Sequence, residues 1–450
     1  MTVSDYNTFV FESYNYRDRT GELRLHYSFE DGPAFEEKIV FPPVSRLLMP
    51  SERAALESSF RLIFLLAGIS YYKAYVPQRL ICHAFPLDEE TAAFVEKVYR
   101  HGLAEFAYRN NVDLSDKLQF VTEEAPAWEA VSLNLPDRLL VPVGGGKDSI
   151  VTLECLKQSG EAPTLFALGG ASGLADPIKA TIDVSGLPSL RVERTLSPNL
   201  MELNRSGALN GHIPITAILS SMTIASAILH GFSTIVMSNE HSASEPNLRV
   251  GEWEINHQYS KSFAFEKDLA RFIKDHITPA LTYFSFLRPL TETAIVRRFA
   301  GLEKYHSVFR SCNAAFRQDA ERRNKNWCCN CPKCRFIFLA LAPFMDKAKL
   351  VGIFGKNLLA DESQQEGFAE LCGLSSHKPF ECVGEIEESA LLMEKLSRYK
   401  DWKDDAVMRA LGGNLAGKIE NAYERFNALF ALRADHQVPD RFLEMLRACF

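Results

Sequence analysis

Hydrophobic and polar residues alternate along two segments near the N-terminus, residues 9–16 and 23–29. Successive side chains of a β-strand point to opposite faces, so this alternation predicts two strands. The sequence Asp18-Arg19-Thr20-Gly21 between them is typical of a hairpin turn. Apolar residues at helical spacing then predict a helix over residues 52–72. We therefore expect an N-terminal α+β domain over residues 1–135.

A different pattern begins at Leu139, where short apolar runs alternate with segments of helical periodicity. The expected strands cover residues 139–143, 164–168, 190–194 and 234–237, and the expected helices cover residues 177–184 and 214–229. This alternation predicts an α/β fold with a parallel sheet, which we assign to a domain over residues 136–345. Mostly amphipathic helices are expected in a third region, residues 346–450.

The first of these strands runs directly into a glycine-rich loop. The loop consists of Gly144, Gly145, Gly146, Lys147, Asp148 and Ser149, and a helical pattern follows it. Backbone N–H groups at the start of a helix attract phosphate, and glycine lets the phosphate approach the backbone closely. The pattern therefore predicts a phosphate site.

Three known phosphate loops can be compared with this one. A Walker A loop needs Ser or Thr after its lysine, whereas Asp148 follows Lys147 here. A dinucleotide fingerprint needs a third glycine where this chain has Ser149. The loop SGGxDS of the N-type ATP pyrophosphatases is similar at every position except Gly144, which stands in place of serine. That resemblance implies ATP cleavage between the α and β phosphates, with transfer of AMP to an oxygen atom.

Composition narrows the class of protein. The 450 residues are 46% hydrophobic and 24% charged, which is ordinary for a soluble globular protein. A net charge of −7 argues against a broad nucleic-acid surface. The first 16 residues lack the basic start and the apolar stretch of a signal peptide. No apolar run in the sequence is a convincing membrane span. We expect a cytoplasmic protein with no nucleic-acid or membrane partner.

Four of the ten cysteines stand close to one another in the sequence, at residues 328–334. The predicted metal ligands are Cys312, Cys328, Cys331 and Cys334. Four thiolates are typical of a closed, structural zinc site, and an iron–sulfur cluster is the less favoured alternative. Cys329 could replace Cys328 as a ligand. The clustering favours a metal in a reducing compartment over a disulfide framework.

The order of motifs over residues 139–343 resembles that of the 7-cyano-7-deazaguanine synthases, which activate a carboxylate with ATP. The shared segments are GGGKDS, Leu287 to Val296, Ser311-Cys312-Asn313 and the cysteine cluster. Glu292 stands where that family usually has lysine. A carboxylate-activating ligase or nitrile-forming enzyme of nucleobase or RNA modification therefore remains an alternative. A zinc-dependent nucleic-acid-binding module is less favoured, because of the net charge and the intact Lys147-Asp148-Ser149.

The whole chain more closely resembles the UDP-N-acetylmuramoyl-L-alanyl-L-glutamate epimerases. The motifs that carry the resemblance are FESY at residues 11–14, the segment 142–149, SNEHSAS at 238–244, NHQYSKS at 256–262 and HKPFECVGE at 377–385. The resemblance implies an enzyme that uses ATP and Mg²⁺ to convert the terminal L-Glu of a UDP-N-acetylmuramoyl dipeptide to D-Glu for peptidoglycan. It leaves the oligomeric state open.

The same resemblance suggests why an epimerase would contain a nucleotide loop. An α-proton beside a carboxylate is a very weak acid, and transfer of AMP to that carboxylate makes the proton easier to remove. The predicted catalytic groups are Lys147, which would neutralise phosphate charge, Asp148, which could hold Mg²⁺, and Glu240 or His241 as the base. The predicted substrate-binding residues are Asn239, Arg249, His257 and Lys261. His212 is a further candidate for the base.

Overall fold

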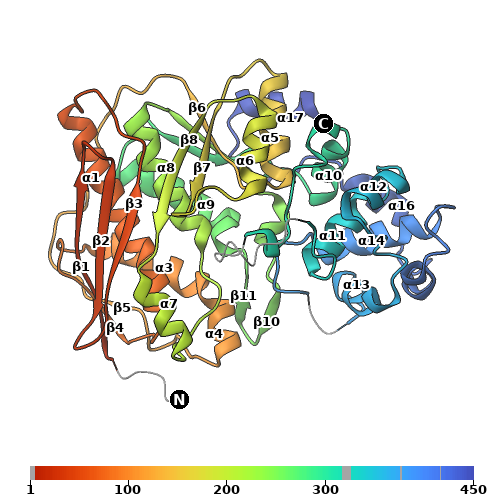
Figure 1. Ribbon diagram of the computed structural model, residues 1–450, viewed down its shortest axis with the longest axis horizontal. Coiled ribbons are helices and arrows are strands. Elements are labelled where there is room, and N and C mark those ends of the chain that lie inside the picture. Colours follow the sequence, from red (N-terminus) through yellow and green to blue (C-terminus); the bar gives the residue numbers. More distant parts are fainter. Residues whose placement is uncertain (1–5, 317–325, 376–377, 416) are drawn as a thin grey trace.

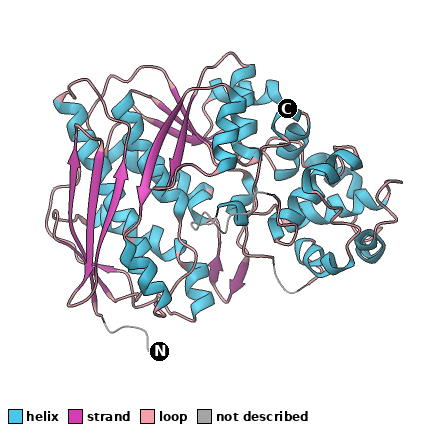
Figure 2. Cartoon of the chain, in the orientation of Figure 1, coloured by secondary structure: helices cyan, strands magenta, loops and turns pink. Residues whose placement is uncertain are grey.

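The computed structural model of this chain describes residues 6–316, 326–375, 378–415 and 417–450, with the side chain of Asn313 left out. Strands β1–β3 lie at one end of the molecule and the C-terminal helices at the other (Figures 1 and 2). The strands are β1 (Thr8–Arg17), β2 (Glu22–Phe29), β3 (Ala34–Val40), β4 (Arg79–Cys82), β5 (Gln119–Phe120), β6 (Leu139–Pro142), β7 (Thr164–Gly169), β8 (Ser189–Thr195), β9 (Thr234–Met237), β10 (Leu248–Val250), β11 (Trp253–Ile255) and β12 (Thr282–Ser285).

Helices cover the sheet and form most of the C-terminal region. They are α1 (Pro50–Ala67), α2 (Ile69–Tyr72), α3 (Glu89–Gly102), α4 (Ala104–Asn110), α5 (Lys147–Gln158), α6 (Asp176–Ser185), α7 (Pro198–Arg205), α8 (Ile215–His230), α9 (Phe263–His276), α10 (Glu292–Ala300), α11 (Pro332–Leu341), α12 (Lys347–Phe354), α13 (Gln365–Leu371), α14 (Ile386–Ser397), α15 (Gly413–Leu415), α16 (Ala422–Ala428) and α17 (Asp440–Cys449).

Ten strands form one sheet in the order β12-β9-β6-β7-β8-β3-β2-β1-β4-β5. The first five of these strands are parallel, which confirms the predicted mixed α/β fold with a largely parallel sheet. β3 pairs with β8 in antiparallel fashion, so the N-terminal strands continue the same sheet. Within the parallel part, the chain moves outward from β6 through β7 to β8 and then returns to β9 on the other side. Ligands of parallel sheets bind beside such a reversal, at the carboxyl ends of the strands.

The two faces of the sheet belong to two different hydrophobic cores. Leu140 and Ile235 pack into the core that also contains α1 and α8. Leu139, Val141 and Val236 pack into the core that contains α5, α10, α11 and α14. Because the side chains of a strand alternate between faces, short apolar runs fill both cores at once.

The apolar helix expected over residues 52–72 is present as α1 and α2. Gly68 separates them, and a Cβ there would lie 2.5 Å from Cε1 of Phe11, so glycine permits the close packing of helix on strand. The segment Pro50–Tyr72 is long and apolar enough to cross a membrane, but 83% of its apolar window is buried in the fold. It is therefore weak evidence for a membrane span.

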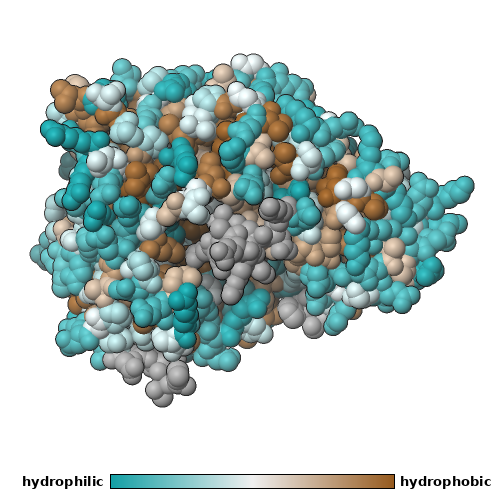
Figure 3. All heavy atoms as spheres, viewed as in Figure 1, coloured by the Kyte–Doolittle hydropathy of each residue, from teal (hydrophilic) through white to brown (hydrophobic). Residues whose placement is uncertain are grey.

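The C-terminal region returns to the sheet domain through α17. A disulfide between Cys155 on α5 and Cys449 on α17 links the two helices. This disulfide was not predicted from the sequence. Hydrophilic residues cover most of the face shown in Figure 3, with small apolar areas between them.

Candidate functional site

The glycine loop follows β6 and leads directly into α5, as expected. Gly145 has a φ of +74°, and a Cβ there would lie 2.7 Å from the carbonyl carbon of Pro177, so this position requires glycine. Gly146 precedes the first turn of α5, whose N–H groups are available to an anion. A Cβ on Gly144 would meet no atom within 4 Å, so a serine would fit at this position.

Three carboxyl groups lie around the amino group of Lys147, a residue of this loop. Lys147 contacts Asp148 and Glu292, and oxygens of Asp148, Glu240 and Glu292 all lie within 4.8 Å of one another. Burial and the charge of Asp148 raise the pKa of Glu240. Burial would lower the pKa of Lys147, but the neighbouring carboxylates raise it above its usual value, so Lys147 is charged. Burial also raises the pKa of Glu292 well above its usual value, although Lys147 opposes this. The three carboxyl groups offer oxygen ligands to a divalent cation, and its charge would favour their ionised forms.

Buried hydrogen bonds hold the cluster in position. Glu388 on α14 accepts hydrogen bonds from the backbone N–H of Glu292, at 3.3 Å, and of Thr293, at 2.7 Å, and so fixes the start of α10. Burial raises the pKa of Glu388 to about 7. On the opposite side, the fully buried Arg288 pairs with Glu266 at 2.8 Å and donates to the backbone carbonyl of Glu240.

A second polar group lies where α4 meets the segment that follows β11. His257 contacts Glu105 of α4 through Nδ1, and the ring of His212 lies 4.0 Å from that of His257, centroid to centroid. Burial lowers the pKa of His257, but hydrogen bonds to Cys382 and Glu105 raise it to about 9. Burial and the neighbouring His257 lower the pKa of His212 to about 3. His257 is therefore a cation at neutral pH, and His212 is neutral.

Lys261 joins this second group to the carboxylate cluster. Its Nζ lies 3.5 Å from Sγ of Cys382. The charge of Cys382 raises the pKa of Lys261, and burial opposes this only in part, while Glu240 and Asp148 raise the pKa further. The backbone carbonyl of Lys261 accepts a hydrogen bond from Arg288 at 2.6 Å.

The C-terminal motif over residues 377–385 packs over the cluster, although His377 lies outside the described residues. Asn247 donates a hydrogen bond to the carbonyl of Pro379 at 2.7 Å. A Cβ on Gly384 would lie 3.3 Å from Cβ of Glu292, so the backbone at this end of the segment lies next to Glu292.

Three other predicted residues, described next, are not members of either polar group. Asn239 donates to Ser285 at 3.1 Å and so links the ends of β9 and β12. Arg249 is on the β10–β11 hairpin, is largely exposed and pairs with Glu254 at 2.7 Å. His241 faces Glu385 at 3.7 Å and lines a cavity of about 520 Å³. Burial and nearby arginines lower the pKa of His241 to about 4, so it is neutral at pH 7.

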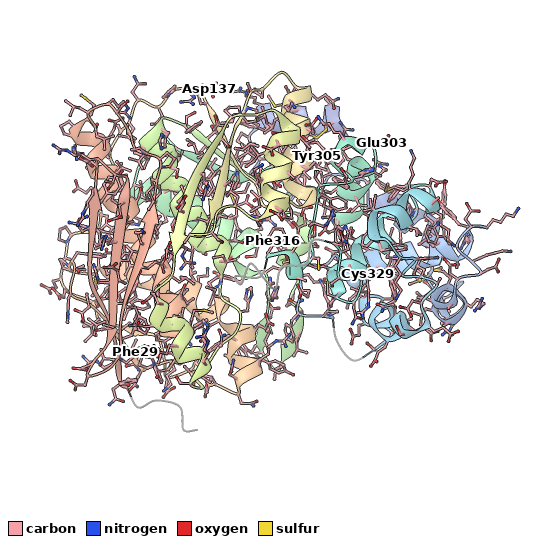
Figure 4. The ribbon with its side chains drawn as sticks, in the orientation of Figure 1. Phe29, Asp137, Glu303, Tyr305, Phe316 and Cys329 are labelled. Carbon is pink, nitrogen blue, oxygen red and sulfur yellow. A yellow bond between two sulfur atoms is a disulfide. The ribbon has the colours of Figure 1, made fainter. Side chains whose placement is uncertain are left out.

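The four predicted metal-binding cysteines come together. Sulfur atoms of Cys312, Cys328, Cys331 and Cys334 lie within 4.8 Å of one another, with Cys328 to Cys334 at 3.6 Å. Zn–S bonds of ~2.3 Å in a tetrahedron place sulfur atoms ~3.8 Å apart, so the group has the dimensions of a zinc site. Cys329, beside the C-terminal helices in Figure 4, contacts the carbonyl of Phe354 instead. Of the two alternatives, Cys328 is therefore the one in the group.

Three residues of these clusters were not among the predicted site residues. Glu292 was noted only as a departure from another family, yet it contacts Lys147. Glu105 and Cys382 are far from the loop in sequence, and neither belongs to a recognised chemical motif. The only signal in the sequence concerned Cys382, which lies in the motif at residues 377–385. No signal pointed to Glu105.

Comparisons with known proteins give one consistent result. Residues 1–286 match the MurL N-terminal domain, and residues 308–426 match the MurL C-terminal domain. The chain is 41% identical to the UDP-N-acetyl-alpha-D-muramoyl-L-alanyl-L-glutamate epimerase of Xanthomonas oryzae pv. oryzae over 99% of this chain and 98% of the relative. Identity to the protein of the same name is 44% in a Micromonospora species, over 90% of each chain. For Salinispora tropica it is 42%, over 90% of this chain and 88% of the relative.

Proposed function

Since this chain belongs to the family of UDP-N-acetyl-alpha-D-muramoyl-L-alanyl-L-glutamate epimerases, we propose that it inverts the α-carbon of the terminal L-Glu of UDP-N-acetylmuramoyl-L-Ala-L-Glu through an acyl adenylate. An epimerase role in peptidoglycan precursor synthesis follows from family membership. The use of ATP, the adenylate and the residue roles are the finer parts of the proposal.

The observation that carries the proposal is a glycine loop at a helix start, next to a charged cluster. The loop N–H groups and α5 would bind the leaving pyrophosphate. Lys147 would neutralise charge that develops when the carboxylate oxygen attacks the α-phosphorus. The bond from the α-phosphorus to the bridging oxygen of pyrophosphate breaks as the new oxygen–phosphorus bond forms.

The carboxylate cluster fits Mg²⁺. Asp148, Glu240 and Glu292 offer oxygen ligands within reach of one cation, whose charge would oppose the raised pKa of Glu240 and Glu292. When bound there, Mg²⁺ would offset the charge of the ATP phosphates. In this role Glu240 is a cation ligand and not the base, and the neutral His241 remains a candidate for proton transfer.

The four cysteines would hold a structural zinc ion. Four thiolates complete a tetrahedral shell and leave no position for a reacting water. Zinc would fix the segment around residue 312 to the start of α11. Arg310 of this segment donates its backbone N–H to the carbonyl of Gly145 at 2.9 Å. Zinc would therefore also help to fix the position of the glycine loop.

Activation of a carboxylate explains how the site can serve epimerisation. The adenylate removes the carboxylate charge, and its leaving group withdraws electrons, so the α-proton becomes more acidic. Hydrolysis after inversion returns the acid and AMP. The UDP-linked substrate is a soluble metabolite, and we therefore place the reaction in the cytoplasm.

Oxygen transfer tests the adenylate directly. The substrate is labelled with ¹⁸O in the glutamate α-carboxylate and incubated with ATP and Mg²⁺. Attack of that oxygen on the α-phosphorus, followed by water attack on the acyl carbon, should leave ¹⁸O in AMP. Formation of ADP, or of unlabelled AMP only, would contradict the adenylate. A product whose formation depends on ammonia would indicate the ligase or nitrile-forming alternative.

A further inference from the structure

Cys382 lies within the segment that packs over the carboxylate cluster. The segment is held at one end by the hydrogen bond from Asn247 to the Pro379 carbonyl, and at its other end Gly384 lies next to Phe336 and Glu292. The Cys382 thiol therefore lies close to the groups that would activate the glutamate, and none of the roles proposed above involves this thiol.

Positive groups surround this thiol from separate elements. Lys261, the last residue of η2 (Tyr259–Lys261), approaches it at 3.5 Å. His257 and Lys333 of α11 also lower its pKa, and Lys333 pairs in addition with Glu381 at 3.6 Å. Glu240 is the negative group that faces it, and Glu105 lies behind His257. Burial raises the pKa of Cys382, but the cations and the His257 hydrogen bond hold it well below the ordinary value. The thiolate is thus the stable form.

His257 connects Glu105 with Cys382, because Glu105 contacts its Nδ1 and the charge of His257 lowers the pKa of the Cys382 thiol. Glu105 occupies Nδ1 of His257, which leaves Nε2 as the nitrogen that can meet the thiol. A sulfur next to an imidazole that a carboxylate orients is a typical arrangement for an activated thiolate. The buried Glu105 comes from α4, so the N-terminal region completes this chain.

We propose that the Cys382 thiolate removes the α-proton of the adenylated glutamate, with His257 and Glu105 as positioning residues; this inference rests on the proposed function. The α-carbon–hydrogen bond breaks, its proton moves to Sγ, and its electron pair forms the enolate of the acyl adenylate. A solvent-derived proton is added to the opposite face of the α-carbon, and the thiol returns its proton to solvent.

The cysteines outside the group of Cys312, Cys328, Cys331 and Cys334 do not share this setting. Burial raises the pKa of Cys82 to about 11 and that of Cys372 to about 12, so both remain thiols at neutral pH. Cys155 and Cys449 form the disulfide. Cys82 is therefore a suitable control position, because it is a buried, free cysteine on β4.

The test separates proton removal from adenylation. C382A and C82A are compared with the wild type by ATP:pyrophosphate exchange and by α-deuterium uptake from D₂O, both with UDP-N-acetylmuramoyl-L-Ala-L-Glu. We expect C382A to keep pyrophosphate exchange but to lose α-deuterium uptake by about 10²–10⁴-fold, and C82A to keep both. Uptake at the wild-type rate in C382A would overturn the inference. Absence of pyrophosphate exchange in the wild type would instead contradict the proposed function.

Two further measurements do not depend on turnover by the variants. Iodoacetamide at pH 7 should alkylate Cys382 faster than Cys82 in the folded protein, and H257Q should move the pH dependence of this alkylation to higher pH. Unchanged pH dependence in H257Q would contradict the positioning role of His257. A thioester between the glutamate and Cys382, detected by mass spectrometry in the quenched wild-type reaction, would overturn proton transfer in favour of covalent catalysis.

Discussion

Replacing Lys147 with methionine tests the charged cluster at its centre. The substitution keeps a long apolar side chain but leaves the neighbouring carboxylates Asp148, Glu240 and Glu292 without their buried cation. Removal of one partner of a buried ion pair destabilises a protein by about 3–5 kcal/mol. Loss of one charge-stabilising donor slows the reaction by about 10²–10³-fold, which corresponds to about 2.7–4 kcal/mol.

The assay measures activity and stability together. ATP:pyrophosphate exchange should fall by about 10²–10³-fold in K147M, and the free energy of unfolding in urea should fall by about 3–5 kcal/mol. The double variant K147M/E292Q removes one of the buried acidic groups that lose Lys147 as their partner, so it should regain stability without regaining exchange. K179M is the matched control, because Lys179 is 70% exposed and pairs only with Asp183 on its own helix among the described contacts.

Two results would refute this reasoning. Pyrophosphate exchange at the wild-type rate in K147M would show that Lys147 does not stabilise the transferred phosphate. Equal stability of K147M and K147M/E292Q would show that Glu292 is not left as an uncompensated charge, and the cluster would then need another explanation.

Three other perturbations follow from the same structure. G145A should destabilise the protein by about 1–3 kcal/mol in urea because of its positive φ, whereas G144A should not; equal effects would contradict the loop geometry. C331S should lose bound zinc, as measured by elemental analysis, and C329S should keep it; zinc loss in C329S would contradict the ligand set. Glu388 has a folded pKa of about 7, so its contribution to stability is present below its unfolded pKa and is lost as pH rises through 7. Between pH 4.5 and 8 the wild type should therefore lose about 3 kcal/mol more stability than E388Q; identical pH profiles would contradict this.

The sequence predicted β1 and β2 from the alternation of apolar and polar residues, and β6, β7 and β9 from apolar runs. β6, β7 and β9 are buried on both faces and end at glycine or polar residues, so their runs were recognisable. β3 was not predicted, because its inward-facing Glu37 interrupts the apolar alternation. Glu37 is tolerated there because it pairs with Arg194 at 2.7 Å and accepts a hydrogen bond from Tyr71 at 2.9 Å. Such partners are distant in sequence and invisible to a local pattern.

The site residues show the same contrast between local patterns, which are predictable, and distant partners, which are not. The loop at Gly144 to Ser149 was predictable, because consecutive residues create it. The grouping of Glu105, Glu292 and Cys382 was not, because each comes from a different helix or segment and acquires its chemistry from neighbours. Glu292 illustrates this, since its spacing along the chain gives no reason to expect contact with Lys147.

Deuterium uptake tests the central claim most directly, namely that ATP makes the α-proton acidic enough to remove. The wild-type protein is incubated in D₂O with UDP-N-acetylmuramoyl-L-Ala-L-Glu and Mg²⁺, with and without ATP, and the glutamate is analysed by chiral chromatography and mass spectrometry. We expect D-Glu that carries α-deuterium, together with AMP, only when ATP is present. Equally fast deuterium uptake without ATP, or D-Glu formation without AMP, would contradict it.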